Sequence, residues 1–220
     1  MNLQKQLEQI QHNLADYPSV KLIAVSKYAT NEQIKEAYDL GIRDFGENYI
    51  VPALKRREEL NLPDDVKWHL LGPIQKNKIN KVVGNFDLIH SVHTEEIAEL
   101  IDQKAGELGL VQDLLLQINL TGDKAGFVPE NFAETYQKLS KLLKINIKGL
   151  MLMNYHEVSE KSETNFKTMR QLLQVMTSQH TDRVFELSMG MTNDYQLAVQ
   201  YGSTMIRVGR ALFGEIGSKI

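Results

Sequence analysis

The chain has 220 residues, with 25 Lys and Arg against 28 Asp and Glu and a formal net charge of −3 at pH 7. Hydrophobic residues make up 42% and charged residues 24% of the sequence, which are ordinary values for a globular protein and argue against intrinsic disorder. The near-neutral balance gives no electrostatic basis for binding nucleic acid or an anionic membrane. The chain contains no cysteine, so disulfides, thiolate metal sites, iron–sulfur clusters and cysteine nucleophiles are excluded.

The N-terminal residues 1–8 lack the apolar stretch of a signal peptide. No apolar run approaches the ~18 residues that a membrane span needs, so we expect a cytoplasmic protein. No low-complexity linker, long charge block or internal repeat marks a domain boundary.

Two hydrophobic periodicities alternate along the chain. Leu3, Leu7, Ile10 and Leu14 recur on one face of a leading helix. The predicted strands are residues 20–26, 42–45, 66–70, 87–90, 113–119, 145–151, 184–187 and 205–208. The predicted helices between and after them centre on residues 34–40, 50–54, 79–83, 97–108, 132–143, 166–176 and 197–201.

Strands that alternate with helices imply a parallel sheet. Eight such strands are the number that closes a (β/α)8 barrel, and a doubly wound open sheet is the alternative. We expect a single (β/α)8 TIM barrel domain over residues 1–220, with an extra N-terminal helix.

A TIM barrel carries its active site at the C-terminal ends of its strands. Polar side chains lie within or just after several predicted strands: Lys27, Asn48, His69, His90, Asn119, Ser188 and Arg207. Polar groups gathered at one end of apolar strands are what a polar ligand in the barrel mouth requires.

Lys27 directly follows an apolar strand. Partial desolvation at that position favours the neutral amine, which can attack an aldehyde and form a Schiff base. The alternative is a lysine that opens a solvated loop.

Ser188, Gly190 and Gly209 surround the last predicted strand. Glycines let backbone N–H groups approach an anion, and barrel phosphate sites often follow strands seven and eight, so these residues are candidates for a phosphate site. Alternatively, the glycines only form turns and helix caps.

Arg207 lies inside an apolar strand, where a guanidinium needs a partner. It either pairs with Glu186 or Asp113 inside the barrel, or donates to a heteroatom of a ligand.

The remaining candidates are methionines and histidines. Met151, with neighbouring methionines, either lines an apolar wall against a flat ring or fills the core. His90 and His93 lack an accompanying carboxylate motif, so we expect no metal site, and the sequence assigns no role to these two or to His156.

The chain resembles the pyridoxal phosphate (PLP) homeostasis proteins, the YggS/PROSC family. The matching segments are residues 24–27 (AVSK), 44–49 (DFGENY), 68–78 (WHLLGPIQKNK), 149–151 (GLM), 187–194 (LSMGMTND) and 202–209 (GSTMIRVG). They follow the family's order and span nearly the whole chain.

The resemblance implies a barrel similar to the N-terminal domain of bacterial alanine racemase. It implies that Lys27 carries PLP as an internal aldimine, and that Ser188, with backbone N–H groups at Gly209 and Arg210, holds the phosphate. Thr192 stands where the family commonly has serine, and Arg210 replaces a small hydroxyl residue whose side-chain contact is therefore lost.

The resemblance also implies that Arg207 faces the pyridine nitrogen, and that Asn48 and His69 face the cofactor pocket. A guanidinium there disfavours protonation of the ring nitrogen and makes the ring a weaker electron sink. Transaminase-like chemistry is therefore not expected.

The resemblance implies a carrier and buffer of PLP that serves vitamin B6 and amino-acid homeostasis, without established catalytic activity. We expect the protein to be a monomer. Expected partners are PLP, other B6 vitamers and PLP-dependent apoenzymes as recipients. One alternative is a PLP-dependent amino-acid racemase of the alanine racemase type, although racemisation needs two positioned acid–base groups and 220 residues leave no room for a second domain to supply one. A further alternative is a PLP-free barrel enzyme that acts on a sugar phosphate.

Overall fold

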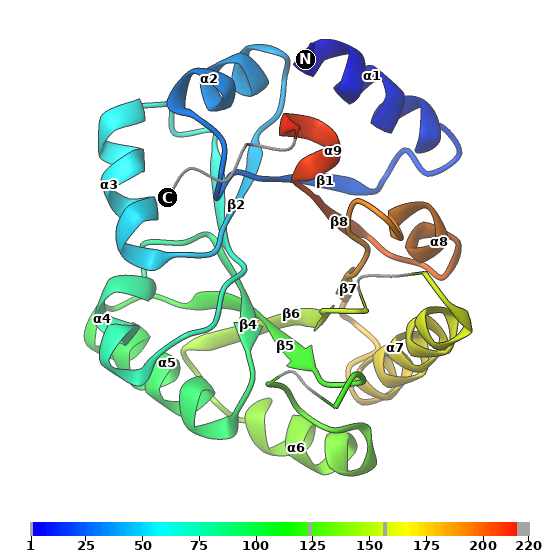
Figure 1. Cartoon of the computed structure of the whole chain (residues 1–220). Helices are drawn as coiled ribbons and strands as arrows, with labels where there is room; N and C mark the ends of the chain where they lie inside the picture. Colours follow the sequence, from blue (N-terminus) through cyan, green and yellow to red (C-terminus); the bar gives the residue numbers. More distant parts are fainter. Residues whose placement is uncertain (1, 123–124, 156–157, 215–220) are drawn as a thin grey trace.

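The computed structural model describes residues 2–122, 125–155 and 158–214. Within these residues the strands form a closed parallel barrel in chain order, from β1 round to β8 (Figure 1). The strands are β1 (Lys21–Val25), β2 (Asp44–Glu47), β3 (Lys67–Leu70), β4 (Leu88–Val92), β5 (Gln112–Ile118), β6 (Ile145–Leu152), β7 (Glu186–Ser188) and β8 (Met205–Val208). The predicted TIM barrel is confirmed, and the open doubly wound sheet is wrong.

The helices surround the barrel as an outer ring (Figure 1). They are α1 (Leu3–Asn13), α2 (Asn31–Asp39), α3 (Ile50–Leu60), α4 (Ile79–Val82), α5 (Glu95–Glu107), α6 (Phe132–Leu139), α7 (Glu160–Gln179), α8 (Tyr195–Gln200) and α9 (Arg210–Phe213). Two single 3-10 turns, η1 (Lys76–Lys78) and η2 (Pro129–Asn131), precede α4 and α6.

The predicted N-terminal helix is α1, which lies between α2 and α8 in the ring (Figure 1). Its buried face carries Leu3, Leu7 and Ile10, and Asn13 Nδ2 donates to the Tyr195 hydroxyl at 2.6 Å. Helix α1 therefore closes the outer layer where the first and last barrel units meet.

The helix starts follow local chemistry. Thr30 caps α2 in a capping box with Gln33, and Thr94 caps α5 by accepting from the Ile97 N–H. Pro52 lies in the first turn of α3, where a missing N–H costs least. Helix α9 has only four residues, which is too short to show a hydrophobic period in the sequence.

Two groups of buried side chains hold the barrel together. The larger core lies between the strands and the surrounding helices and includes Phe45, Trp68 and Leu114. A smaller cluster, made of Ile23, Leu88, Leu115, Met151 and Met205, comes from alternate positions on the other side of the strands and fills the barrel interior. Burying each such side chain stabilises the fold by about 1.5–3 kcal/mol before entropy is counted.

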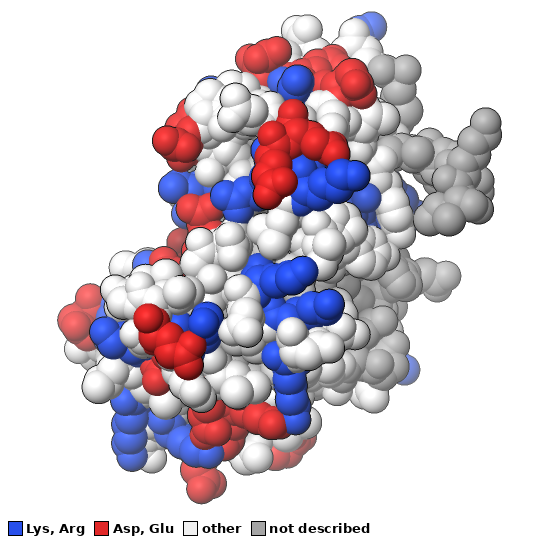
Figure 2. All heavy atoms as spheres, turned by 90° about the vertical axis from the view of Figure 1, so that its left-hand side faces the viewer, with Lys and Arg blue, Asp and Glu red and all other residues white. Residues whose placement is uncertain are grey.

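The surface over α3 and α4 carries charges of both signs, interspersed (Figure 2). Lys55 and Glu59 pair along α3, and Lys76 pairs with Glu96 of α5. Among the described helices, none has the length and apolar character needed to span a bilayer.

Candidate functional site

The mouth of the barrel brings the ends of β1, β2 and β3 together. Val25 pairs with Gly46 in the sheet, and Lys27 and Asn48 each lie two residues beyond this pair, so both leave the barrel at the same level. Lys27 is half-buried, and its Nζ lies 4.9 Å from the ring centre of Tyr28.

Asn48 presents a polar atom without a partner. Its Oδ1 is buried and accepts no hydrogen bond within the described part of the chain. The backbone carbonyl of Asn48 packs on Gly72, where a Cβ would lie only 1.9 Å from that oxygen, so only glycine fits. The Ser91 hydroxyl fixes the Gly72 carbonyl at 2.6 Å. Asn48 is therefore held in a rigid turn, with an acceptor left over.

A cluster of polar contacts involves Ser26, the residue just before Lys27. The Ser26 hydroxyl donates to Glu47 Oε1 at 2.8 Å, and Arg56 Nη1 donates both to Glu47 Oε1 at 2.7 Å and to the Ser26 carbonyl at 2.8 Å. Burial raises the pKa of the Glu47 carboxyl, while Arg56 and Ser26 lower it. This cluster, the Arg56 clamp, fixes the backbone that leads into Lys27. Arg56 could not be singled out from the sequence, because it is one of several charged residues on α3.

The turn after β8 is flanked by a hydroxyl from the turn after β7. Gly209 and Arg210 open helix α9, whose first N–H groups have no intrahelical acceptor. The Ala211 N–H lies 3.4 Å from Thr192 Oγ1. Ser188, which the sequence predicts to hold a phosphate together with this turn, pairs with Met205 in the sheet. Its side chain is fully buried and bonds to His90 and Arg207.

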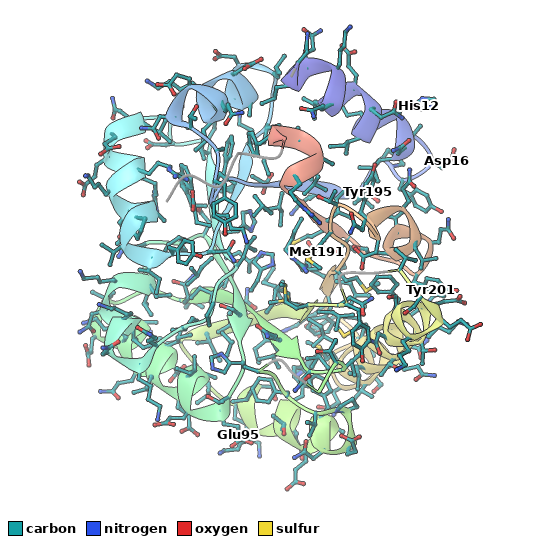
Figure 3. The ribbon with its side chains drawn as sticks, viewed as in Figure 1. His12, Asp16, Glu95, Met191, Tyr195 and Tyr201 are labelled. Carbon is teal, nitrogen blue, oxygen red and sulfur yellow. The ribbon has the colours of Figure 1, made fainter. Side chains whose placement is uncertain are left out.

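Gly190 makes the bend that separates Ser188 from Thr192. Its φ of +96° is a conformation that other residues rarely adopt, and an added Cβ would lie 2.7 Å from the Ala198 Cβ. Asp194 Oδ1 accepts from the Met191 N–H at 2.6 Å, and burial raises the pKa of this carboxyl. Figure 3 shows Met191 near the barrel axis, whereas Glu95 lies at the outer edge. The bend therefore directs residues 191 and 192 to the mouth.

Arg207 crosses the barrel interior from β8. Its Nη1 donates to Ser188 Oγ at 2.6 Å, and its Nη2 donates to the Leu152 carbonyl at 2.7 Å and contacts Met153 Sδ at 3.7 Å. Burial lowers its pKa to about 10, against the opposing effect of Asp194, which leaves the guanidinium charged at neutral pH.

Neither carboxylate that the sequence suggested as a partner for Arg207 pairs with it. Glu186 lies 3.8 Å from Lys21 Nζ, and Asp113 accepts from Asn146 at 2.8 Å. The expectation of an ion pair with either residue is wrong, because both lie at the N-terminal end of the barrel, below the guanidinium.

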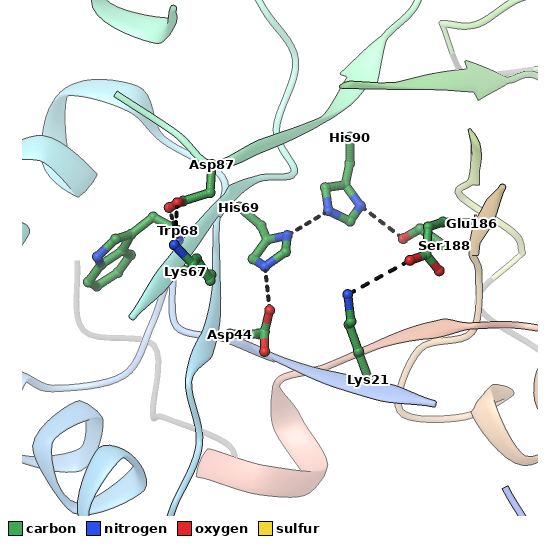
Figure 4. A network of polar contacts seen from close by, with 9 residues as sticks. All are labelled: Lys21, Asp44, Lys67, Trp68, His69, Asp87, His90, Glu186 and Ser188. Atoms are coloured by element: carbon green, nitrogen blue, oxygen red, sulfur yellow. Dashed lines mark hydrogen bonds and ion pairs between the residues drawn. The ribbon is translucent and has the colours of Figure 1, made fainter. Parts of the chain in front are cut away.

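A chain of polar contacts continues from Ser188 across the interior (Figure 4). His90 Nδ1 lies 2.9 Å from Ser188 Oγ, His90 Nε2 lies 3.0 Å from His69 Nδ1, and His69 Nε2 lies 2.9 Å from Asp44 Oδ1. Burial, together with the electrostatic effect of neighbouring His69 and Arg207, lowers the pKa of His90 well below its ordinary value. Both ring nitrogens of His69, expected to face the cofactor pocket, are thus occupied by protein groups.

The remaining sequence candidates lie in varied places. Met151 is fully buried in the interior cluster, while Met153 packs above it and is partly exposed. The His93 ring donates through Nδ1 to the Ser91 carbonyl at 2.9 Å. His156 lies outside the described residues. Among the described residues, no three His, Asp or Glu side chains are grouped to hold a metal ion.

Comparison with known proteins identifies relatives over nearly the full chain. Residues 1–216 match the family model of the alanine racemase N-terminal domain. A pyridoxal phosphate homeostasis protein of Synechocystis sp. is 40% identical over 201 residues, which cover 90% of this chain and 92% of the relative.

Solved structures agree with this relationship. PipY of Synechococcus elongatus PCC7942, solved with PLP bound, superposes with a TM-score of 0.89 at 40% identity and covers 97% of this chain and 100% of its own. Alanine racemase of Clostridium difficile 630 shares the fold with a TM-score of 0.79 at 20% identity, and the match covers 99% of this chain but only 58% of the racemase. The chain therefore belongs to the alanine racemase N-terminal domain family, among the pyridoxal phosphate homeostasis proteins.

Proposed function

We propose that this protein binds PLP reversibly at the barrel mouth and acts as an intracellular carrier and buffer of the cofactor. The observation that carries the proposal is the likeness to PipY, a relative of almost equal extent whose structure contains PLP. Cytoplasmic location, a monomeric state, binding of other B6 vitamers and delivery to PLP-dependent apoenzymes belong to the same proposal.

The groups at the mouth fit the functional groups of PLP. The Lys27 amine suits the aldehyde, with which it forms a reversible C=N bond and releases water. The N–H groups at Gly209 and Arg210, with the Thr192 hydroxyl beside them, suit the phosphate. This assignment replaces Ser188 with Thr192.

Two further side chains suit the ring of PLP. Asn48 Oδ1, a buried acceptor without a protein partner, suits a donor on the ring substituents. A guanidinium has five N–H donors, and Arg207 directs three contacts at Ser188, Leu152 and Met153. The remaining N–H groups suit an acceptor nitrogen. PLP supplies an electrophilic aldehyde on a ring that withdraws electrons.

Amino-acid racemisation is not favoured. Arg207 stays charged at neutral pH even though burial lowers its pKa to about 10. A charged donor opposite the ring nitrogen disfavours protonation of that nitrogen, which weakens the ring as an electron sink and argues against transaminase-like chemistry. Racemisation needs instead two acid–base groups positioned on opposite faces of the ring, and the match to alanine racemase covers only 58% of that enzyme.

Absorbance and chemical trapping test the proposal. The purified protein incubated with PLP should become yellow, and borohydride reduction should attach the cofactor to the peptide that contains Lys27. Lys27→Ala should abolish the trapped adduct. Lys21→Ala, a control at the opposite end of the same strand, should keep it. A colourless wild-type protein, or an adduct that persists in Lys27→Ala, would overturn the proposal. A colourless protein that binds sugar phosphates would favour the PLP-free enzyme instead.

A further inference from the structure

We propose that Ser188, His90, His69 and Asp44 form a one-way hydrogen-bond relay that holds Arg207 in place, with both histidines acting as positioning residues. From Arg207 on β8 the relay passes through β7, β4 and β3 to β2, and so crosses the barrel interior. Figure 4 shows its part from Ser188 to Asp44. The proposal rests on the proposed function only for what Arg207 faces, because the relay is a property of the ligand-free chain.

The direction of the relay follows from the donor at one end. A guanidinium can only donate, so Ser188 Oγ accepts from Arg207 Nη1. The Ser188 hydroxyl has one proton, and its remaining neighbour among the described residues is His90 Nδ1 at 2.9 Å. His90 therefore accepts at Nδ1 and carries its own proton on Nε2.

The proton on His90 Nε2 determines the tautomer of His69. His90 Nε2–H faces His69 Nδ1 at 3.0 Å, so His69 accepts there and carries its proton on Nε2. That proton faces Asp44 Oδ1 at 2.9 Å, where a carboxylate accepts it. Both imidazoles are thus neutral and have the same tautomer, and every proton along the relay points toward Asp44.

The reverse direction leaves a buried donor unpaired. If His90 donated from Nδ1, Ser188 Oγ would accept from both sides and its own proton would have no acceptor. Ser188 and His90 are both 0% exposed, so water does not replace the lost bond. An unpaired buried donor of this kind shifts the equilibrium by roughly tenfold or more toward the forward direction.

The two ends explain what the relay does. Arg207 is a buried cation, only 3% exposed, and a buried charge needs satisfied hydrogen bonds. Asp44 supplies a carboxylate at the floor of the barrel, where its side chain is 26% exposed. The aligned dipoles between them hold one edge of the guanidinium, and its free N–H groups are left for a ligand acceptor.

Nitrogen NMR of the imidazole rings tests the direction without any ligand. In the ligand-free protein near pH 7, His69 and His90 should each show a protonated Nε2 and a bare Nδ1, with assignments made from the signals that disappear in His69→Gln and His90→Gln. A proton on Nδ1 of either ring, or a protonated His90, would overturn the relay.

Matched serine variants test the link to Arg207. Ser188→Ala cuts the relay, whereas Ser203→Ala removes a second buried hydroxyl that lies between the same two strands and bonds to the Met189 carbonyl. Ser188→Ala should change the His90 tautomer signals. It should also weaken the binding of both PLP and pyridoxal roughly tenfold, the cost of one hydrogen bond to a charged group. Ser203→Ala should leave the His90 signals and the two affinities unchanged.

The outcomes separate this proposal from the proposed function. If Ser188→Ala leaves both the tautomers and the two affinities unchanged, the relay is wrong while PLP binding stands. If the wild-type protein binds neither PLP nor pyridoxal, the proposed function fails, and the tautomers of the ligand-free protein still decide the relay. Should Ser188→Ala fail to fold, the wild-type spectra give the same decision.

Discussion

At the scale of single residues, two hydroxyls four positions apart have different roles. Thr192 lies at the mouth beside the Ala211 N–H, while Ser188 is fully buried between His90 and Arg207. We assign the contact with the phosphate of PLP to Thr192 and the positioning of Arg207 to Ser188. Substitution of either residue should therefore weaken the binding of a different part of the ligand.

Thr192→Val removes the hydroxyl and keeps the side-chain shape. It should weaken PLP binding roughly tenfold, since a hydrogen bond to a charged phosphate is lost, and it should leave the affinity for pyridoxal, which has no phosphate, unchanged. Fluorescence titration with both vitamers measures this. The Thr192→Ser variant should bind PLP like the wild type, whereas Ser188→Ala should weaken the binding of both PLP and pyridoxal. Equal losses for PLP and pyridoxal in Thr192→Val would refute the assignment.

At the scale of elements, α3 reaches over the ends of β1 and β2 through the Arg56 clamp. Arg56 Nη1 bonds to the Ser26 carbonyl and to Glu47 Oε1, and Glu47 is 2% exposed. Since Ser26 directly precedes Lys27, the contact of one helix with two strands fixes the backbone at the reactive amine.

Arg56→Ala should reduce both stability and PLP binding. It leaves a buried carboxylate without its cation, which costs about 3–5 kcal/mol for a fully buried pair and less here, because Arg56 remains 20% exposed. Urea unfolding and PLP titration measure the two effects. The adjacent Lys55→Ala breaks only the exposed pair with Glu59 and should cost at most about 1 kcal/mol.

A double variant distinguishes loss of the Arg56–Glu47 contact from non-specific destabilisation of the fold. In Arg56→Ala with Glu47→Gln the carboxylate is also gone, so part of the lost stability should return. If the two losses simply add, the pair does not act as a clamp.

The elements show why the fold was predictable from the sequence and the site only in part. Each strand and its helix leave a local period, so β1 through β8 could be placed to within a few residues. The strand ends likewise placed Lys27 and Asn48 together at the mouth. The pairing of His69 with His90, by contrast, depends on which way each strand faces in the closed barrel. The choice between Ser188 and Thr192 depends on the bend at Gly190, which periodicity does not reveal.

At the scale of the whole molecule, the barrel interior is divided between an apolar cluster and the polar relay. Ile23, Leu115 and Met205 belong to the cluster, and His69 and His90 belong to the relay. Polar groups in a core cost stability unless every donor and acceptor is paired. The relay meets this condition at neutral pH. The condition should no longer hold when a group inside the barrel takes up a proton.

The contribution of His90 to the stability of the fold should therefore fall as the pH is lowered below about 6.5, the ordinary pKa of histidine. Burial holds the pKa of His90 in the folded protein well below this value. In the window between the two values the unfolded chain binds a proton that the folded protein does not. Each pH unit below 6.5 then lowers the free energy of unfolding by up to ~1.4 kcal/mol.

Glu47 and Asp194 act in the opposite sense, because burial raises their pKa values. Their contributions to stability decrease as the pH rises above the ordinary carboxyl range. The pH dependence of wild-type stability therefore combines the effects of these carboxyls with that of His90.

The difference in stability between the wild type and His90→Gln gives the contribution of His90 alone. Urea unfolding between about pH 7.5 and 5.5 should show a smaller loss of stability in His90→Gln than in the wild type. His12→Gln, a control at an exposed histidine of α1, should follow the wild type. Parallel curves for the wild type and His90→Gln would mean that His90 takes up its proton as readily in the folded barrel as in the unfolded chain.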